Sequence, residues 1–272
     1  MSVVIDTEIQ EFMERVGHSP VSALLLDYDG TLAPFSIDRR HAVPYPGIRA
    51  LLQDIIDTRR TRVVIVTGRS AEEVNPLLGL DPPPEVWGSH GLQRLRPDGT
   101  SEMPELDPTA LQALVDAERW LSYQGLAHMA EPKPGSLAVH WRGLNENAAT
   151  ELRGRILLGW LPIAEPTTLT VLEFDGGLEL RVPEQDKTDA IHTIFEEIGP
   201  NAPAAYLGDD VTDERAFRAM QNRGLAVLVR QERRKTAARV WLKPPEELLE
   251  FLSRWREACR TTSLARTATY SR

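Results

Sequence analysis

Two acidic residues, Asp27 and Asp29, directly follow the apolar run Leu24–Leu26. The run predicts a buried strand, and Gly30 predicts the turn that ends it. Ligands of open α/β sheets bind at the carboxyl ends of the strands. Two carboxylates this close repel each other unless a cation or a shared proton compensates, and Mg²⁺ is a natural compensation beside a phosphate. The pair therefore indicates a Mg²⁺ site for a phosphorylated ligand, with an ordinary polar turn as the alternative.

Three more polar groups lie where a predicted strand ends or a predicted helix begins. They are the segments Thr67–Arg69 and Gly208–Glu214 and the isolated Lys187. Each has an ordinary explanation alone, because Lys187 suits a surface, Thr67 a turn, and Asp213 the positive end of a helix dipole. Only their joint occurrence, in this order along the chain, favours a single site.

The apolar periodicity predicts the elements that position these residues. Helices are expected over about 9–16, 48–56, 108–121, 145–160, 191–198 and 248–255, and after Ser70 and Asp213. Strands are expected over about 24–26, 62–66, 85–87, 204–207, 225–229 and 239–242, and alternating strands over 135–142, 169–174 and 177–182. The alternation of strands and helices predicts an α/β fold with a parallel sheet, and the alternating strands predict an antiparallel segment.

The chain is predicted to form one domain interrupted by another. The composition becomes polar over 96–107, the antiparallel segment follows, and the α/β pattern resumes at Gln185. We expect a core domain over 1–102 and 184–260, an inserted domain over 103–183, and hinges near 96–106 and 182–186. Residues 261–272 are predicted to be a disordered tail.

Composition excludes several classes of function. The 272 residues include 31 Lys and Arg and 40 Asp and Glu, a formal net charge of −9, which disfavours a nucleic-acid or anionic-membrane surface. The single cysteine, Cys259, excludes a disulfide framework and a cysteine-based zinc site. No membrane-spanning run or signal-peptide core is found, and we expect a cytoplasmic protein and a monomer. The run Arg233–Lys235 is interpreted as a solvated charged surface.

Together the four motifs resemble those of the haloacid dehalogenase-like phosphatases. They are a DxDGT loop at 27–31, a threonine at 67, a lysine at 187 and a GDDxTDE loop at 208–214. The resemblance implies a Rossmann-like parallel-sheet core with an inserted α+β cap domain between the second and third motifs. It also implies that Asp27, Asp209 and the backbone carbonyl of Asp29 bind Mg²⁺.

Phosphate chemistry explains the first motif. Phosphate monoesters hydrolyse extremely slowly in water, and a carboxylate nucleophile divides the reaction into two steps through an acyl phosphate. Asp27 is the expected nucleophile. Asp29 is expected to protonate the departing alkoxide and then to take a proton from the attacking water.

The other three motifs are expected to surround the phosphate. The hydroxyl of Thr67 and the amide of Gly68 can donate to phosphate oxygens, while Lys187 balances the charge of the phosphate and of Asp27. Asp213 is expected to support the metal site from outside the ligand set, whereas Asp210 is either a further ligand, ranked below Asp209, or a second support.

Within this superfamily, nearly the whole chain is similar to the trehalose-6-phosphate phosphatases. The similarity rests on Gly68–Ser70, Gly88–Gly91, Glu131–Lys133, His140–Arg142, Glu179–Arg181 and Gly208–Glu214. It implies hydrolysis of trehalose 6-phosphate, the last step of trehalose biosynthesis, with a cap that contacts the sugars on closing. The implied substrate-binding residues are Gly68, Arg69, His90, Gly91, Glu131, Lys133, His140, Arg142 and Glu179. On the periodicity alone, His140 and Arg142 share one face of a strand, and the alternative is the solvent side of a half-exposed sheet.

Two other functions are considered. The first is a phosphatase of another glycosyl phosphate, either sucrose 6-phosphate or a glucosyl- or mannosyl-3-phosphoglycerate. The second is a catalytically silent module that senses sugar phosphates, against which the intact set Asp27, Asp29, Lys187 and Asp209 argues. Phosphate release from a panel of sugar phosphates discriminates among them.

Overall fold

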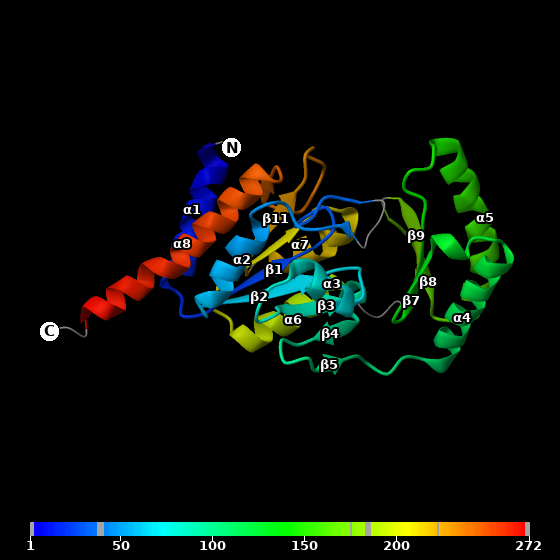
Figure 1. The fold of residues 1–272 in the computed structure, drawn as a ribbon, viewed down its shortest axis with the longest axis horizontal. Helices are drawn as coiled ribbons and strands as arrows, with labels where there is room; N and C mark the ends of the chain where they lie inside the picture. The colour runs from blue at the N-terminus through cyan, green and yellow to red at the C-terminus, as the bar shows by residue number, and fades with distance from the viewer. Residues whose placement is uncertain (1–2, 37–40, 175, 183–185, 222, 270–272) are drawn as a thin grey trace.

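The computed structural model of the chain describes residues 3–36, 41–174, 176–182, 186–221 and 223–269. Within these ranges the strands form a large sheet and a small sheet, which lie side by side along the longest axis of the molecule (Figure 1). No helix in this part of the chain is both long enough and apolar enough to cross a membrane.

The large sheet is parallel except at one edge, in the order β12-β11-β10-β1-β2-β3-β4-β5. Its parallel strands are β1 (Ser22–Leu26), β2 (Thr61–Val66), β3 (Glu85–Gly88), β10 (Ala204–Gly208), β11 (Leu225–Val229) and β12 (Val240–Leu242). The antiparallel edge strands are β4 (Gln93–Leu95) and β5 (Ser101–Glu102). The predicted α/β class with a parallel core is confirmed.

Helices cover both faces of the large sheet (Figure 1). One face packs against α1 (Val3–His18), α2 (Ile48–Asp57), α3 (Ala71–Leu78) and α8 (Glu246–Thr269), and the other against α6 (Lys187–Ile198) and α7 (Glu214–Met220). Leu24 and Leu26 of β1 contribute to the first core cluster, whereas Leu25 contributes to the second. A strand buried on both faces must be apolar throughout, which explains the continuous run that precedes Asp27.

The small sheet is antiparallel, in the order β6-β7-β9-β8. It consists of β6 (Ala130–Lys133), β7 (Ser136–His140), β8 (Thr170–Phe174) and β9 (Gly177–Arg181). Leu137, Val139 and Leu178 pack against α4 (Pro108–Tyr123) and α5 (Glu146–Ala164), which cover the outer face. The opposite face, with the predicted side chains His140 and Glu179, is turned toward the large sheet (Figure 1).

Three short strands were not predicted from the apolar periodicity of the sequence. β4 and β5 have only three and two residues, and β5 lies inside the predicted hinge 96–106. β6 contains Pro132, which an edge strand tolerates because one side of its backbone needs no partner. The other predicted hinge lies mostly outside the described residues, which omit 183–185.

The chain leaves the large sheet after Glu102, packs against it again with α6 from Lys187, and re-enters it at β10. The division into core segments 1–102 and 184–260 and an inserted domain 103–183 stays our proposal, since residues 183 and 184 are not among those described. The predicted disordered tail over 261–272 stays a prediction, and the structure extends α8 as far as Thr269. No glycine or proline occurs between Glu246 and Thr269 to end the helix.

Candidate active site

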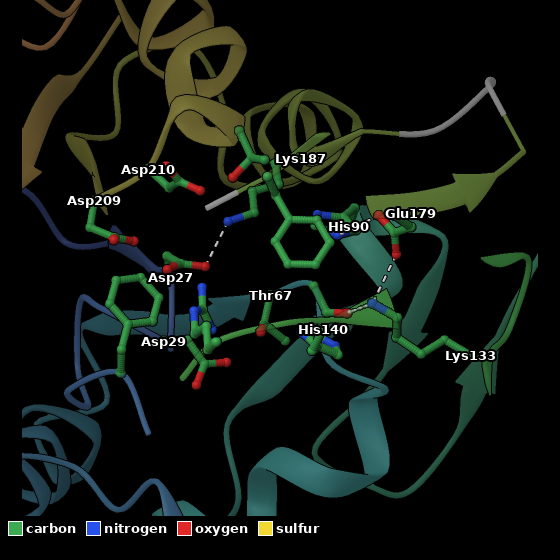
Figure 2. Close-up of a pocket in the computed structure, with 15 residues that line it drawn as sticks. Asp27, Asp29, Thr67, His90, Lys133, His140, Glu179, Lys187, Asp209 and Asp210 are labelled. Atoms are coloured by element: carbon green, nitrogen blue, oxygen red, sulfur yellow. Dashed lines mark hydrogen bonds and ion pairs between the residues drawn. The ribbon is translucent and has the colours of Figure 1, made fainter. Parts of the chain in front are cut away.

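The carboxyl ends of three neighbouring strands bring the motif residues together. Asp27, Thr67 and Asp209 are the first residues after β1, β2 and β10, which pair in register. The Asp27 amide donates to the Leu207 carbonyl at 2.9 Å and so extends the ladder by one residue. A cavity of about 90 Å³ lies at this edge, between the two sheets (Figure 2). This is the edge at which an open α/β sheet binds ligands.

Gly30 allows the acidic residues to approach each other. Its φ of +86° is a left-handed conformation that favours glycine. A Cβ atom at this position would lie 2.2 Å from Oδ2 of Asp209. Gly30 therefore leaves space for the carboxylate of Asp209, a residue far from it in the sequence.

Lys187 links two of the buried carboxylates. It is the first residue of α6, whose start is fixed by a capping box between Asp186 and Asp189. Its side chain is 5% exposed, and Nζ lies 2.6 Å from Oδ1 of Asp27 (Figure 2). The same Nζ lies 2.7 Å from Oδ1 of Asp213. The lysine is thus a buried, doubly paired cation rather than a surface residue.

Three carboxylates, those of Asp27, Asp209 and Asp213, offer oxygen atoms within 4.8 Å of one another. Asp213 is already saturated by hydrogen bonds. Its Oδ1 accepts from Lys187 and from the Tyr206 hydroxyl at 2.6 Å, and its Oδ2 accepts from the amides of Asp209 and Asp210, both at 3.0 Å. An ionised carboxylate accepts about four hydrogen bonds, so Asp213 has no acceptor site left over for a cation.

Asp209 has the opposite character. It is 2% exposed, and its Oδ2 has no hydrogen-bond partner among the residues described. Burial, together with repulsion from Asp27 and Asp213, raises the pKa of Asp209 well above its usual range. Burial also raises the pKa of Asp27 to about 7, although Lys187 opposes the shift. A buried anion without a partner costs several kcal/mol, so these residues fit a hard divalent cation.

Asp29 is held by Arg69, which the sequence resemblance assigned to the substrate. Arg69 is 1% exposed, and its Nε and Nη2 both lie 2.6 Å from the Asp29 carboxylate. Its guanidinium also lies over the Tyr28 ring, 5.3 Å from the centroid. Arg69 does not line the cavity, so its direct contact with the substrate stays a prediction beside the contact with Asp29 that the structure shows.

Thr67, Gly68 and His90 form the side of the cavity beside Asp27. His90 has a φ of 59°, a conformation that non-glycine residues rarely adopt, and its amide donates to the Thr67 carbonyl at 2.9 Å. A Cβ atom on Gly68 would lie 2.6 Å from the His90 ring. Gly91 does not line the cavity, and a Cβ atom on it would lie 2.5 Å from the Asp186 carbonyl oxygen.

The small sheet closes the cavity with a polar cluster. Glu179, 3% exposed, lies 2.8 Å from Nζ of Lys133 and 3.1 Å from Nε2 of His90 (Figure 2). Lys133 also donates to the Gly68 carbonyl at 2.9 Å. Glu131 does not line the cavity but lies 2.6 Å from Nε2 of His140, which does. The predicted side chains of the two sheets thus contact each other directly.

Most residues predicted for the site line the cavity. They are Asp27, Asp29, Thr67, Gly68, His90, Lys133, His140, Arg142, Glu179, Lys187, Asp209 and Asp210. The sequence did not predict two aromatic residues that also line it, Phe35 and Phe174. Phe35 is 40% exposed, and Cζ of Arg142 lies over its ring, 4.3 Å from the ring centroid. An aromatic residue in the polar loop after the DxDGT motif was the available signal.

The interpretation of 233–235 as a solvated charged surface is wrong for Arg234. Its side chain is only 19% exposed and donates to the carbonyl oxygens of Asp210 at 2.6 Å and Asp209 at 3.4 Å. It also pairs with Glu214. A cation that satisfies three oxygens of the acidic loop fixes that loop from outside the cavity, whereas its neighbour Arg233 is exposed.

The profile of the trehalose-phosphatase family matches residues 25–245, which include both the carboxylate site and the small sheet. The chain belongs to the trehalose-phosphatase family. It is 33% identical over 269 residues to the trehalose-phosphate phosphatase of Mycobacterium marinum. That alignment covers 91% of this chain and 66% of the relative, so the chain spans about two thirds of the relative's length.

Solved structures agree with the fold of a trehalose-phosphatase family member. The C-terminal domain of Candida albicans trehalose-6-phosphate phosphatase matches with a TM-score of 0.76 at 18% identity, over 92% of this chain and 96% of that one. A haloacid dehalogenase-like hydrolase from Bacteroides thetaiotaomicron matches with a TM-score of 0.60 at 14% identity, over 86% and 99%. The haloacid dehalogenase-like fold expected from the four motifs is confirmed.

Proposed function

We propose that the protein is a Mg²⁺-dependent phosphatase that hydrolyses trehalose 6-phosphate to trehalose and phosphate, the last step of trehalose biosynthesis. The observation that carries the proposal is the Lys187–Asp27 pair, 2.6 Å apart, in the cavity between the sheets of a trehalose-phosphatase family member. A buried carboxylate, a fixed cation and hydroxyl and amide donors are what phosphoryl transfer to an aspartate requires.

Asp27 is the proposed nucleophile. Lys187 Nζ holds its Oδ1, and the Thr31 hydroxyl donates to Oδ2 at 3.3 Å, which fixes the plane of the carboxylate. In the first step, an Asp27 oxygen bonds to phosphorus while the bond to the sugar oxygen breaks. Water then attacks the aspartyl phosphate, releasing phosphate and regenerating the carboxylate. Thr67 and Gly68 are positioned to donate to the phosphate oxygens in both steps.

Mg²⁺ would be held by the carboxylates of Asp27 and Asp209 and by the Asp29 carbonyl. The bound ion would offset the charge between the phosphate and Asp27. The unpartnered Oδ2 of Asp209 supports this assignment, and the saturation of Asp213 by hydrogen bonds supports a role for that residue outside the ligand set. Asp210 lines the cavity and has its amide bonded to Asp213, and we keep it outside the proposed ligand set.

Arg234 is expected to stabilise the metal loop, so Arg234→Ala should weaken Mg²⁺ binding about tenfold. Loss of partners outside the ligand set commonly lowers metal affinity 10- to 100-fold. The measurement is Mg²⁺ binding by titration calorimetry, and the matched control is Arg233→Ala, from the exposed neighbour. Equal Mg²⁺ affinity in the two variants would contradict a role of Arg234 in the loop.

Asp29 is the proposed general acid and base, and Arg69 its positioning partner. Arg69→Lys keeps the positive charge but loses the bidentate contact that orients the Asp29 carboxylate. General acid–base catalysis contributes about 10²- to 10⁴-fold to the rate. We therefore expect a misoriented Asp29 to lower kcat about tenfold for every substrate. Kinetics with trehalose 6-phosphate and an aryl phosphate, beside the exposed control Arg59→Lys, measure this. A loss confined to trehalose 6-phosphate would instead support the direct sugar contact implied by the sequence.

The sugar portion is proposed to contact the small sheet through Lys133, His140, Arg142 and Glu179. These side chains face the proposed nucleophile across the cavity, and carboxylates with cationic donors are suitable partners for sugar hydroxyls. Closure of this cap over the core would exclude water from the reaction.

Phosphate release from a panel of sugar phosphates tests the function. The panel holds trehalose 6-phosphate, sucrose 6-phosphate, glucosyl-3-phosphoglycerate and glucose 6-phosphate, each with Mg²⁺ and with excess chelator. We expect metal-dependent release with a strong preference for trehalose 6-phosphate. Preference for another member would overturn the substrate, and binding without release would favour the sensing module.

A further inference from the structure

A second cavity of about 370 Å³ adjoins the catalytic one. The two share His90, Phe174, Glu179, Lys187 and Thr212 along their common boundary. Pockets for small organic ligands commonly measure about 300–1,000 Å³. The catalytic cavity, at about 90 Å³, therefore has room for a phosphate group but not for a disaccharide. The rest of a disaccharide phosphate must extend into a neighbouring space.

The walls of the second cavity come from both parts of the chain. The small sheet contributes Leu172 and Arg181, and the segment after β10 contributes Val211 and Arg215. Leu172 is 39% exposed and Val211 67% exposed, so each presents apolar surface to the cavity. A sugar ring has two apolar faces formed by C–H groups and a rim of hydroxyls. The apolar side chains of Leu172 and Val211 are suited to pack against such a face.

The charged groups of the second cavity suit an uncharged, hydroxyl-rich ligand. Arg215 is paired with Asp186 at 2.9 Å, and Glu173 and Glu179 add two more acids beside Arg181. Lys187 also lines the cavity, so three cationic side chains balance three acidic ones, which disfavours an ionic ligand. The Nε atom of Arg181 is buried and has no hydrogen-bond partner among the described residues, so it can donate to a hydroxyl.

We propose that this second cavity binds the sugar ring that is farther from the phosphate. The proposal rests on the proposed function, because it names where that substrate's second ring lies. Leu172, Arg181 and Arg215 then determine specificity, because they distinguish a disaccharide phosphate from a hexose phosphate or an aryl phosphate, neither of which has a second ring to place there.

The test fills the cavity with Leu172→Trp. We expect the ratio of kcat/KM for trehalose 6-phosphate to kcat/KM for an aryl phosphate to fall about tenfold, since a single misfitted group in a binding pocket costs about 10- to 200-fold. The matched control is Leu158→Trp, at a 79% exposed leucine of α5 outside both cavities. Thermal unfolding of both variants checks that the fold is intact. An unchanged ratio in a folded Leu172→Trp variant would overturn the proposal.

Binding of trehalose itself separates this proposal from the proposed function. Titration calorimetry with phosphate-free trehalose should detect binding to the unsubstituted chain and at least tenfold weaker binding to Leu172→Trp. If the unsubstituted chain releases phosphate from no sugar phosphate, the proposed function fails, whereas this difference in trehalose affinity still supports the second cavity. Equal trehalose affinity in Leu172→Trp and Leu158→Trp would overturn the second cavity even where turnover is found.

Discussion

Asp27→Asn is expected to lower the turnover of trehalose 6-phosphate by about 10⁴-fold or more, because removing a catalytic nucleophile costs losses of this order. The amide cannot form an acyl phosphate. Folding should be preserved, because Lys187 keeps its contact with Asp213 at 2.7 Å, and the substitution removes one of three crowded buried acids. Kinetics and thermal unfolding, with Asp57→Asn on the exposed side of α2 as control, measure both effects.

Trapping of the aspartyl phosphate tests the nucleophilic role of Asp27 without relying on reaction rates. Hydroxylamine converts acyl phosphates into hydroxamates, so trapping during turnover followed by peptide mass analysis should mark Asp27. Appreciable residual activity of Asp27→Asn, or a hydroxamate at another carboxylate, would remove Asp27 from the nucleophilic role.

The core of the site was predictable because its residues follow the carboxyl ends of adjacent parallel strands. Asp27, Thr67 and Asp209 each follow an apolar run, and the carboxyl ends of adjacent parallel strands meet at one edge. The sequence alone therefore indicated that they converge. Lys187 was different, since nothing in its own surroundings in the sequence separates it from a surface lysine, and only the family's order of motifs singled it out.

The partners of long side chains could not be predicted in the same way. Arg69 contacts Asp29, 40 residues away, and Arg234 contacts the carbonyl of Asp210, 24 residues away. Periodicity reports which face of an element is buried, but not which distant group a flexible guanidinium reaches. The sequence therefore did not indicate that Arg69 contacts Asp29 or that Arg234 contacts the loop of Asp210.

The small sheet shows an intermediate case. The alternation over 135–142 correctly placed Leu137 and Val139 toward the helices and His140 on the opposite face. The β6 strand was missed, since its proline and its short length weaken any pattern. Its contribution to the site, Lys133, was found only through the family motif. Short edge strands carry too few residues for their periodicity to be read.

Glu179→Gln is expected to lower kcat/KM for trehalose 6-phosphate about 10²-fold and to affect an aryl phosphate much less. Burial opposes ionisation of Glu179, but Lys133 and His90 hold its pKa well below the usual range, so the side chain is a carboxylate. A hydrogen bond from a sugar hydroxyl to a charged acceptor contributes about 1.5–3 kcal/mol, which corresponds to this loss. An aryl phosphate has no hydroxyl to place there.

The glutamine variant is chosen over alanine because of what surrounds the carboxylate. Ser136 donates to Oε1 at 2.9 Å, and an amide oxygen can still accept that bond, whereas alanine would leave a hole beside the buried ammonium of Lys133. Kinetics with both substrates are compared with Glu118→Gln, an exposed position on α4. Equal losses on both substrates would mean that Glu179 orders the catalytic side of the cavity through His90 and does not recognise the sugar.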